Sequence, residues 1–378
     1  MCANLTTYIL NPPSAVKIGR TPTLIDLDVS QNLLSVPGTV AASTITLDNI
    51  SPATQASSTN IAPNTSSLVL WHGSTDIKSN ADLYKAQVEK LGAAIDLRLN
   101  QKNKDVVASS AGDQSNGNAN TSTNTNQMDG KAAGIIVNTS GWIEDKGYQI
   151  LLHTIQALRI NVILVLKSEK LYSMLQSHFK KVKESMNNGD VVVGGGVANV
   201  AVTVVPKVIK LRESGGLCSR NVDFRSITRR DCIKRYFYGE SIISKRTKPE
   251  EPAQIVSQYS PSLVELPFSD LTLFRLSGVS LSASMLPVSA KQATDAVQLT
   301  PVNIEPTLTK AVLAVCHPTA VNSYMSSGDA KDLYLSGISG FVVVDKIDLE
   351  TEMLSLLSPC AGELPSKTLL VGDVAWLE

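Results

Sequence analysis

The sequence predicts an α/β fold: a parallel sheet with flanking helices, followed by a smaller, β-rich C-terminal domain. In roughly the first two thirds of the chain, short apolar runs alternate with segments whose apolar residues recur at helical spacing. This alternation is typical of parallel strands joined by crossover helices. Further on, short β-like runs follow one another closely. With 378 residues, the chain has room for about two domains.

Composition and charge are those of an ordinary globular chain. Hydrophobic residues make up 43%, and 34 Lys and Arg balance 34 Asp and Glu. A nucleic-acid-binding role would therefore have to rest on a local patch. The longest apolar runs are strand-sized, so no membrane span is predicted. Five scattered cysteines without a C-x-x-C pair predict reduced thiols in an intracellular protein rather than a disulfide framework or a zinc site.

The first predicted strand, Thr23–Val29, follows a short helix fragment within residues 1–20 that Pro12-Pro13 interrupts. The apolar run of this strand ends at Asp28, and Gln31 stands three residues later. A buried parallel strand delivers a carboxylate in this way to the ligand-binding edge of a sheet, where it can hold Mg²⁺ or orient a nucleophile beside phosphates. The alternative is a core strand that ends in a helix-capping Asp.

The other elements of the first domain, residues 1–250, follow in order. They are a strand at Leu68–Trp71, a helix at Leu83–Leu99, a strand at Ala133–Val137, a helix at Gln149–Leu158, a strand at Asn161–Leu166, a helix at Leu171–Val182 and a strand at Val202–Leu211. Two inserts, near 109–130 and 187–201, are too polar or Gly-rich to bury much apolar surface. The glycines Gly194-Gly-Gly196 lack the Lys-Ser/Thr that would make a phosphate loop.

The C-terminal domain is expected to span residues 251–378. Pro- and Ser-rich stretches near 245–262 indicate the boundary. The predicted strands are Leu271–Leu276, Val312–Val315, Gly340–Asp345, Met353–Leu357 and Leu369–Trp376.

Two further stretches could carry chemistry. Thr139-Ser-Gly-Trp142 stands where a core strand ends, so its glycine could let backbone approach phosphates and its indole could stack on a base. The alternative is a loop Trp that covers the core. Residues 207–248 carry an excess of about eight positive charges, with Arg225 and Arg229 on one helical face. Such a pair suits a lid over triphosphate or a nucleic-acid backbone, and the alternative is a solvated helix face.

Taken in this order, these stretches resemble the Clp-type polynucleotide 5′-hydroxyl-kinase family of P-loop proteins. The branch they most resemble is the Clp subunit of the pre-mRNA cleavage and polyadenylation factor (cleavage factor IA, or complex II). The marks of the resemblance are Asp26-Leu-Asp28-Val-Ser-Gln31, Ser35-Val-Pro-Gly-Thr39, Thr139-Ser-Gly-Trp142, Arg235-Tyr-Phe-Tyr-Gly239, Gly340-Phe-Val-Val-Val-Asp345 and Leu364-Pro-Ser-Lys367. The resemblance implies a P-loop NTPase-like sheet, incomplete at its N-terminus, and an α/β closing domain.

The resemblance also implies residue roles. Asp28 and Gln31 match a Walker B-type D-x-x-Q, in which the Asp activates the 5′-hydroxyl and takes part in binding Mg²⁺. Arg225 and Arg229 match a lid that neutralises charge on the transferring phosphoryl group.

For RNA, the resemblance implies that Thr139, Gly141 and Trp142 form a clasp whose Trp stacks on a base. The implied cofactors are ATP and Mg²⁺. The Walker A loop, G-x-x-x-x-G-K-[ST], does not occur in the 378 residues, so we do not expect this chain to bind ATP tightly.

Three interpretations follow from the resemblance. The first is a scaffold subunit of the nuclear mRNA 3′-end cleavage and polyadenylation machinery, inactive as a kinase, that binds other subunits and has no membrane role. The alternative is an RNA polynucleotide 5′-hydroxyl kinase that transfers the γ-phosphate of ATP to RNA 5′-OH ends. The third is a truncated gene model, since the family's Walker A loop would end just before Cys2.

Overall fold

The computed structural model of the chain describes residues 22–45, 67–110, 134–187, 205–212, 220–239, 241–243, 255–257, 259–278 and 297–376. The helix fragment predicted within residues 1–20 lies outside these residues, and so does most of the two predicted inserts. Two compact units form: residues 1–140 together with 223–378, and residues 141–222. The first unit contains strands from both predicted domains, so the division at residue 250 stays a prediction.

The first unit has a four-stranded sheet in the order β3-β2-β1-β4. Its strands are β1 (Thr23–Asp26), β2 (Thr39–Thr44), β3 (Leu68–Trp71) and β4 (Ile135–Asn138). The neighbours β1 and β4 run parallel, with Asp26 opposite Asn138, whereas β2 is antiparallel to both β1 and β3. The sequence predicted β1, β3 and β4 but not β2. The residues of β2 are mostly Ala, Ser and Thr, which give no clear apolar pattern.

A glycine turn leads into β2. Gly38 has φ +83°, a left-handed conformation that residues with a side chain rarely adopt, and a Cβ there would lie 2.6 Å from Cγ2 of Val374. The carbonyl of Gly38 accepts hydrogen bonds from the N–H groups of His72 and Gly73. This turn fixes where the chain returns after Asp28.

Helix α4 (Ala81–Ser110) follows β3 and a short 3₁₀ turn, η2 (Ile77–Ser79). The side chain of Asn80 accepts a hydrogen bond from the N–H of Leu83, 3.1 Å, as an N-cap does. On this helix Leu83, Val88, Leu91 and Ile95 are buried, which confirms the predicted helical spacing.

A seven-stranded sheet makes up most of the C-terminal part, in the order β11-β10-β15-β12-β13-β14-β9. Its strands are β9 (Ser262–Pro267), β10 (Thr272–Gly278), β11 (Val297–Pro301), β12 (Ala311–Cys316), β13 (Ile338–Asp348), β14 (Met353–Ser358) and β15 (Thr368–Ala375). All neighbours are antiparallel except β10 and β15. The five predicted strands are confirmed, and the two strands that the sequence missed, β9 and β11, lie at the sheet edges.

Smaller elements complete this unit. They are the pair β7 (Ser241–Ile243) and β8 (Ile255–Ser257), the turns η3 (Phe268–Asp270) and η4 (Pro306–Leu308), and the helices α8 (Val222–Tyr238), α9 (Pro318–Ser327) and α10 (Lys331–Tyr334).

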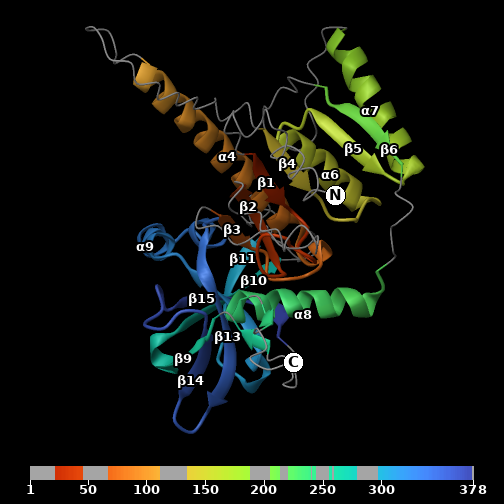
Figure 1. The fold of residues 1–378 in the computed structure, drawn as a ribbon. Helices are drawn as coiled ribbons and strands as arrows, with labels where there is room; N and C mark the ends of the chain where they lie inside the picture. Colours follow the sequence, from red (N-terminus) through yellow and green to blue (C-terminus); the bar gives the residue numbers. More distant parts are fainter. Residues whose placement is uncertain are drawn as a thin grey trace, which may run out of the picture. The chain divides into compact units, whose positions relative to one another are not determined.

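A shared core joins α8 to both sheets of this unit. Phe237 of α8 stacks on Trp376, with ring centroids 5.6 Å apart and an interplanar angle of 10°. Phe341 of β13 contacts Tyr236 of α8 and Trp71 of β3, at centroid distances of 5.4 and 5.6 Å. Figure 1 shows α8 beside β13 and β15. The core therefore fixes α8 against the strands that carry the site described below.

The second unit is a βαβ arrangement with a preceding helix. It comprises α6 (Lys146–Ala157), β5 (Val162–Leu166), α7 (Glu169–Asn187) and β6 (Lys207–Leu211), and β5 and β6 run parallel. Ile155, Val165, Leu175 and Phe179 form its buried core. The predicted alternation of helices with parallel strands is confirmed here.

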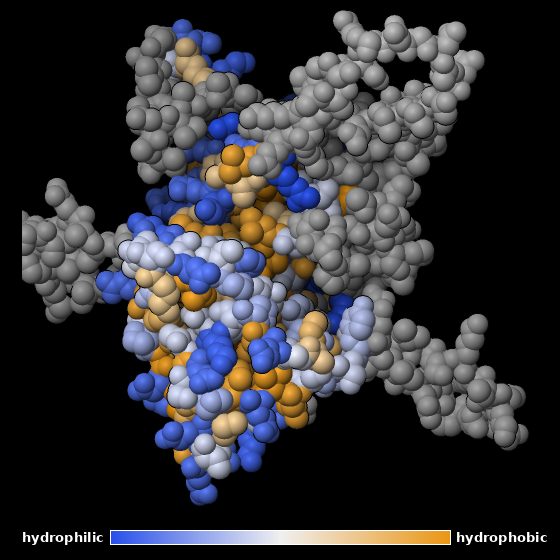
Figure 2. Space-filling view, turned by 90° about the vertical axis from the view of Figure 1, so that its left-hand side faces the viewer, coloured by the Kyte–Doolittle hydropathy of each residue, from blue (hydrophilic) through white to orange (hydrophobic). Residues whose placement is uncertain are grey.

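The described surface is mixed in character. Figure 2 shows apolar patches interspersed with hydrophilic residues on the face that it draws, and single exposed apolar residues are normal on protein surfaces. Among the described helices, none is both long and apolar enough to cross a lipid bilayer. Cys232, Cys316 and Cys360 are free thiols.

Candidate functional site

Asp26, the last residue of β1, organises the loop that carries Asp28. Its side chain is 0% exposed. One carboxylate oxygen accepts hydrogen bonds from the N–H of Asp28, 3.1 Å, and from Nδ2 of Asn138, 2.9 Å. The other accepts from the N–H of Leu33, 2.6 Å. Burial raises the pKa of Asp26 to about 7, although these hydrogen bonds oppose the rise.

Two more buried polar side chains hold the same loop. Asn32 donates from Nδ2 to the carbonyl of Thr39, 3.0 Å, and its Oδ1 accepts from the N–H of Leu34, 2.8 Å. The Tyr84 hydroxyl on α4 donates to the carbonyl of Leu27, 2.9 Å. Because buried polar groups are paired on both sides of Asp28, the loop is preorganised rather than free to move.

Asp28 is a half-buried carboxylate in this loop. Its Oδ1 accepts a hydrogen bond from the N–H of Ser30, 3.0 Å. Burial raises its pKa, while the N–H groups of Ser30 and Gln31 and the charge of Arg225 lower it. The helix-cap interpretation is wrong, because no helix begins between residues 26 and 39. Gln31 lies beside it, and its buried Nε2 has no hydrogen-bond partner among the described residues.

Helix α8 brings both arginines to this loop. Nη1 of Arg229 donates to Oγ of Ser30, 3.4 Å, and the charge of Arg225 acts on Asp28. One turn along, Sγ of Cys232 donates to the carbonyl of Ser35, 3.4 Å, and burial raises the pKa of this thiol to about 11. Arg225 therefore acts on the carboxylate of Asp28, and Arg229 contacts the same loop at Ser30. The catalytic roles of both arginines stay predictions.

The clasp residues are divided between the two units. Thr139 is exposed and follows β4 in the first unit, while Gly141 and Trp142 belong to the second. The half-buried indole of Trp142 packs on the start of α6, where a Cβ on Gly147 would lie 2.7 Å from its Cγ. Trp142 therefore packs against α6, and base stacking and the covering of the core both stay predictions.

The residues fit Mg²⁺ only in part. The described residues contain no group of three or more His, Cys, Asp or Glu placed to hold a metal ion. Asp26 is fully buried and its oxygens accept three hydrogen bonds, which leaves Asp28, with the charge of Arg225 acting on it, as the more accessible carboxylate. Mg²⁺ often binds through one or two carboxylates plus substrate phosphates. Asp28 would therefore hold the ion together with phosphate oxygens rather than in a protein cage.

Sequence reasoning missed the residues that support Asp28. Asp26 stands two residues before Asp28, and this D-x-D spacing was the available signal. Asn32 is one residue beyond Gln31, but nothing in the sequence indicated that its side chain turns inward. Tyr84 and Cys232 are separated from the loop by tens to hundreds of residues, so only the fold shows their contacts.

Comparisons with known proteins agree with this arrangement. The model of the family "mRNA cleavage and polyadenylation factor CLP1 P-loop" matches residues 3–112 and 117–197. The model of "Pre-mRNA cleavage complex II protein Clp1" matches residues 259–378.

Individual relatives resemble nearly the whole chain. The Protein CLP1 homologs of Arabidopsis thaliana and Dictyostelium discoideum are 32% and 30% identical to it, over 96% of the chain. The Polyribonucleotide 5′-hydroxyl-kinase Clp1 of Danio rerio is 29% identical over the same share. The chain spans 65%, 63% and 66% of the length of these three relatives.

Two solved structures have a similar fold. Both contain Clp1p in complex with Pcf11p, and one of them addresses the loss of ATP in a point mutant. Each has a TM-score of 0.65 to this chain and covers 99% of it, at 23% and 21% identity. The chain covers 71% and 70% of those two chains. Together with the match to the P-loop family model, this likeness shows a P-loop NTPase-like α/β architecture with a β-rich C-terminal part.

Proposed function

The chain belongs to the Clp1 family of pre-mRNA cleavage complex II proteins, and from this premise we propose that it is a non-catalytic subunit of the mRNA 3′-end cleavage and polyadenylation machinery. In this proposal it acts in the nucleus as a scaffold that binds another subunit of the factor. The observation that carries the proposal is the similarity over 99% of the chain to Clp1p structures that contain Pcf11p. We propose a Pcf11-like subunit as the partner.

The phosphate site supports a scaffold over a kinase. Asp28, Arg225 and Arg229 supply a metal-binding carboxylate and two charges that could neutralise phosphate oxygens. The Lys and backbone nest of a Walker A loop, which cradle a triphosphate, are not among the 378 residues. We therefore do not expect the 378-residue polypeptide to bind ATP tightly.

A second candidate function is phosphoryl transfer to RNA 5′-hydroxyl ends, and the geometry around Asp28 favours it. The raised pKa of Asp28 makes it a stronger base than a solvated Asp, suited to accept the proton of an attacking hydroxyl. Arg225 and Arg229 stand where they could offset charge on a transferring phosphoryl group. Asp28 would help to hold Mg²⁺, which would supply positive charge to offset that of the phosphate oxygens.

Transfer of radiolabel from the γ-phosphate of ATP to a 5′-hydroxyl oligoribonucleotide separates the two functions. The 378-residue polypeptide and its Asp28→Ala variant would be assayed side by side, with a Clp1 relative named as a kinase as the positive control. The scaffold proposal predicts no transfer above the Asp28→Ala background. Transfer that exceeds that background and depends on Mg²⁺ would establish the kinase instead.

A further inference from the structure

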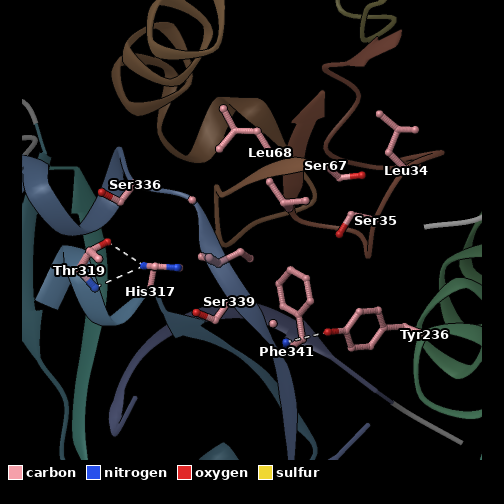
Figure 3. Close-up of a pocket in the computed structure, with 14 residues that line it drawn as sticks. Leu34, Ser35, Ser67, Leu68, Tyr236, His317, Thr319, Ser336, Ser339 and Phe341 are labelled. Carbon is pink, nitrogen blue, oxygen red and sulfur yellow. Dashed lines mark hydrogen bonds between the residues drawn. The ribbon is translucent and has the colours of Figure 1, made fainter. Parts of the chain in front are cut away.

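A cavity of about 660 Å³ lies within the first unit, between the loop after Asp28, β3, α8 and the start of β13 (Figure 3). We propose that this cavity binds an uncharged peptide segment of a partner protein. The inference rests on the proposed scaffold function in so far as the occupant is a protein. It names a binding site that is separate from the side chains of Asp28, Arg225 and Arg229.

Three of the motifs singled out in the sequence meet at this cavity without taking part in phosphate chemistry. Ser35 comes from Ser35-Val-Pro-Gly-Thr39, Tyr236 from Arg235-Tyr-Phe-Tyr-Gly239, and Phe341 from Gly340-Phe-Val-Val-Val-Asp345. The hydroxyl oxygen of Tyr236 accepts the N–H of Phe341, 3.1 Å, and a phenolic hydroxyl can donate as well as accept. The motifs thus build a polar site at the junction of two sheets.

The described lining carries no charged side chain. No Lys, Arg, Asp or Glu is among the fourteen residues that line the cavity in the described part of the chain. A nucleotide or an RNA backbone would bring phosphates into it without a cation to offset them, which is costly. The volume lies within the range of pockets that hold drug-sized ligands, roughly 300 to 1,000 Å³, so the cavity has room for a short part of a peptide.

The polar groups of the lining match the main chain of a peptide. Nδ1 of His317 accepts the N–H of Thr319, 3.3 Å, and lies 2.7 Å from its hydroxyl. In the neutral ring the proton is then on Nε2, which Figure 3 shows directed away from Thr319. Ser35, Ser336 and Ser339 add hydroxyl groups that can donate or accept. A peptide presents alternating N–H and C=O groups, so it can use both kinds of partner.

The apolar residues of the lining could bind one apolar side chain of the peptide. Leu68 of β3 and Phe341 of β13 both line the cavity (Figure 3), and so do Val69 and Ile338. An apolar side chain placed there would remove this surface from water, at about 25 cal/mol per Å². We therefore expect a bound segment with one apolar anchor and no charged residue beside it.

Two serine substitutions provide the test. Ser339→Trp places an indole in the mouth of the cavity, and Ser326→Trp is the matched control on an exposed face of α9 outside it. Both serines are exposed, so both variants should unfold at the same temperature as the wild type. The peptide probe is a displayed library of random dodecapeptides, selected against the full chain. A fluorescent oligouridylate is the second probe and measures nucleic-acid binding.

The proposal predicts peptides that lack Asp, Glu, Lys and Arg at their selected positions. Their affinity should fall at least tenfold in Ser339→Trp and be unchanged in Ser326→Trp. Equal affinity for Ser339→Trp and wild type, selection of charged peptides, or oligouridylate binding that Ser339→Trp abolishes would each overturn it. A Pcf11-like subunit that binds Ser339→Trp as well as wild type would overturn the site but leave the scaffold function standing. Failure of that subunit to bind the wild type would instead overturn the scaffold function.

Discussion

Asn138 at the end of β4 donates a 2.9 Å hydrogen bond to the carboxylate of Asp26 at the end of β1. The two residues are opposite each other in the parallel register. Through the same carboxylate, the N–H groups of Asp28 and Leu33 are tied to this strand pair. The position of Asp28, the candidate metal ligand, therefore depends on the buried carboxylate of Asp26.

Replacement of Asp26 should destabilise the first unit. In Asp26→Ala, three donors lose their acceptor in a buried setting, so we expect a loss of about 3 kcal/mol in the free energy of unfolding. Asn138→Ala removes one of these bonds and should cost about 1 kcal/mol. Urea denaturation followed by circular dichroism measures both. An Asp26→Ala protein as stable as the wild type would show that this hydrogen-bond set does not hold the loop.

The stacked pair Phe237 and Trp376 should be the main anchor of α8. Phe237 is fully buried, so Phe237→Ala leaves a cavity and is expected to cost about 3 to 5 kcal/mol. Phe224 lies on the same helix and is 48% exposed, so Phe224→Ala should change stability by less than about 1 kcal/mol. Thermal unfolding of the two variants would compare them, and equal losses would argue against the anchor.

His72 should make stability depend on pH. Burial lowers its pKa from 6.5 to about 4, against the opposing charge of Asp76. Between pH 6.5 and 4 the unfolded chain therefore binds a proton at His72 that the folded chain does not. The free energy of unfolding is highest above pH 6.5 and decreases as the pH falls toward 4. The full difference is about 3 kcal/mol.

Unfolding free energies between pH 4 and 7 test this dependence. His72→Gln should flatten the curve. A wild-type curve that is already flat across this interval, or one that His72→Gln leaves unchanged, would contradict the assignment to His72.

Local patterns were sufficient to predict the strands and helices with strong apolar spacing. The apolar run before Asp28 predicted β1, and the spacing of Leu83, Val88 and Leu91 predicted α4. Strand β2 was missed because Ala and Ser give no period, and its place is set by pairing with β1 and β3.

The candidate site could be predicted only as separate pieces. Asp28, Arg225 and Arg229 were identified from local motifs, but their proximity depends on the docking of α8 through Phe237 onto Trp376. Contacts between distant segments, such as Tyr84 with Leu27, leave no periodic signal in the sequence. For the same reason the cavity beside Phe341 could not be predicted, although the sequence analysis identified the three motifs that contain Ser35, Tyr236 and Phe341.

ATP should bind the 378-residue polypeptide weakly. Asp28 and the two arginines would contact only part of a triphosphate, and a Walker A nest is not among these residues. Calorimetric titration of ATP with Mg²⁺ should give no sub-micromolar binding, and Arg229→Gln should weaken whatever binding remains. Sub-micromolar affinity would mean that other residues of the chain form the cradle.

Assembly with a Pcf11-like subunit tests the scaffold function most directly. The purified 378-residue polypeptide would be mixed with that subunit in the absence of ATP and analysed by size-exclusion chromatography with light scattering. The proposed function predicts a one-to-one complex, formed equally well by Asp28→Ala because the phosphate site is not needed for it. Separate elution of the two proteins at all concentrations would contradict the proposal.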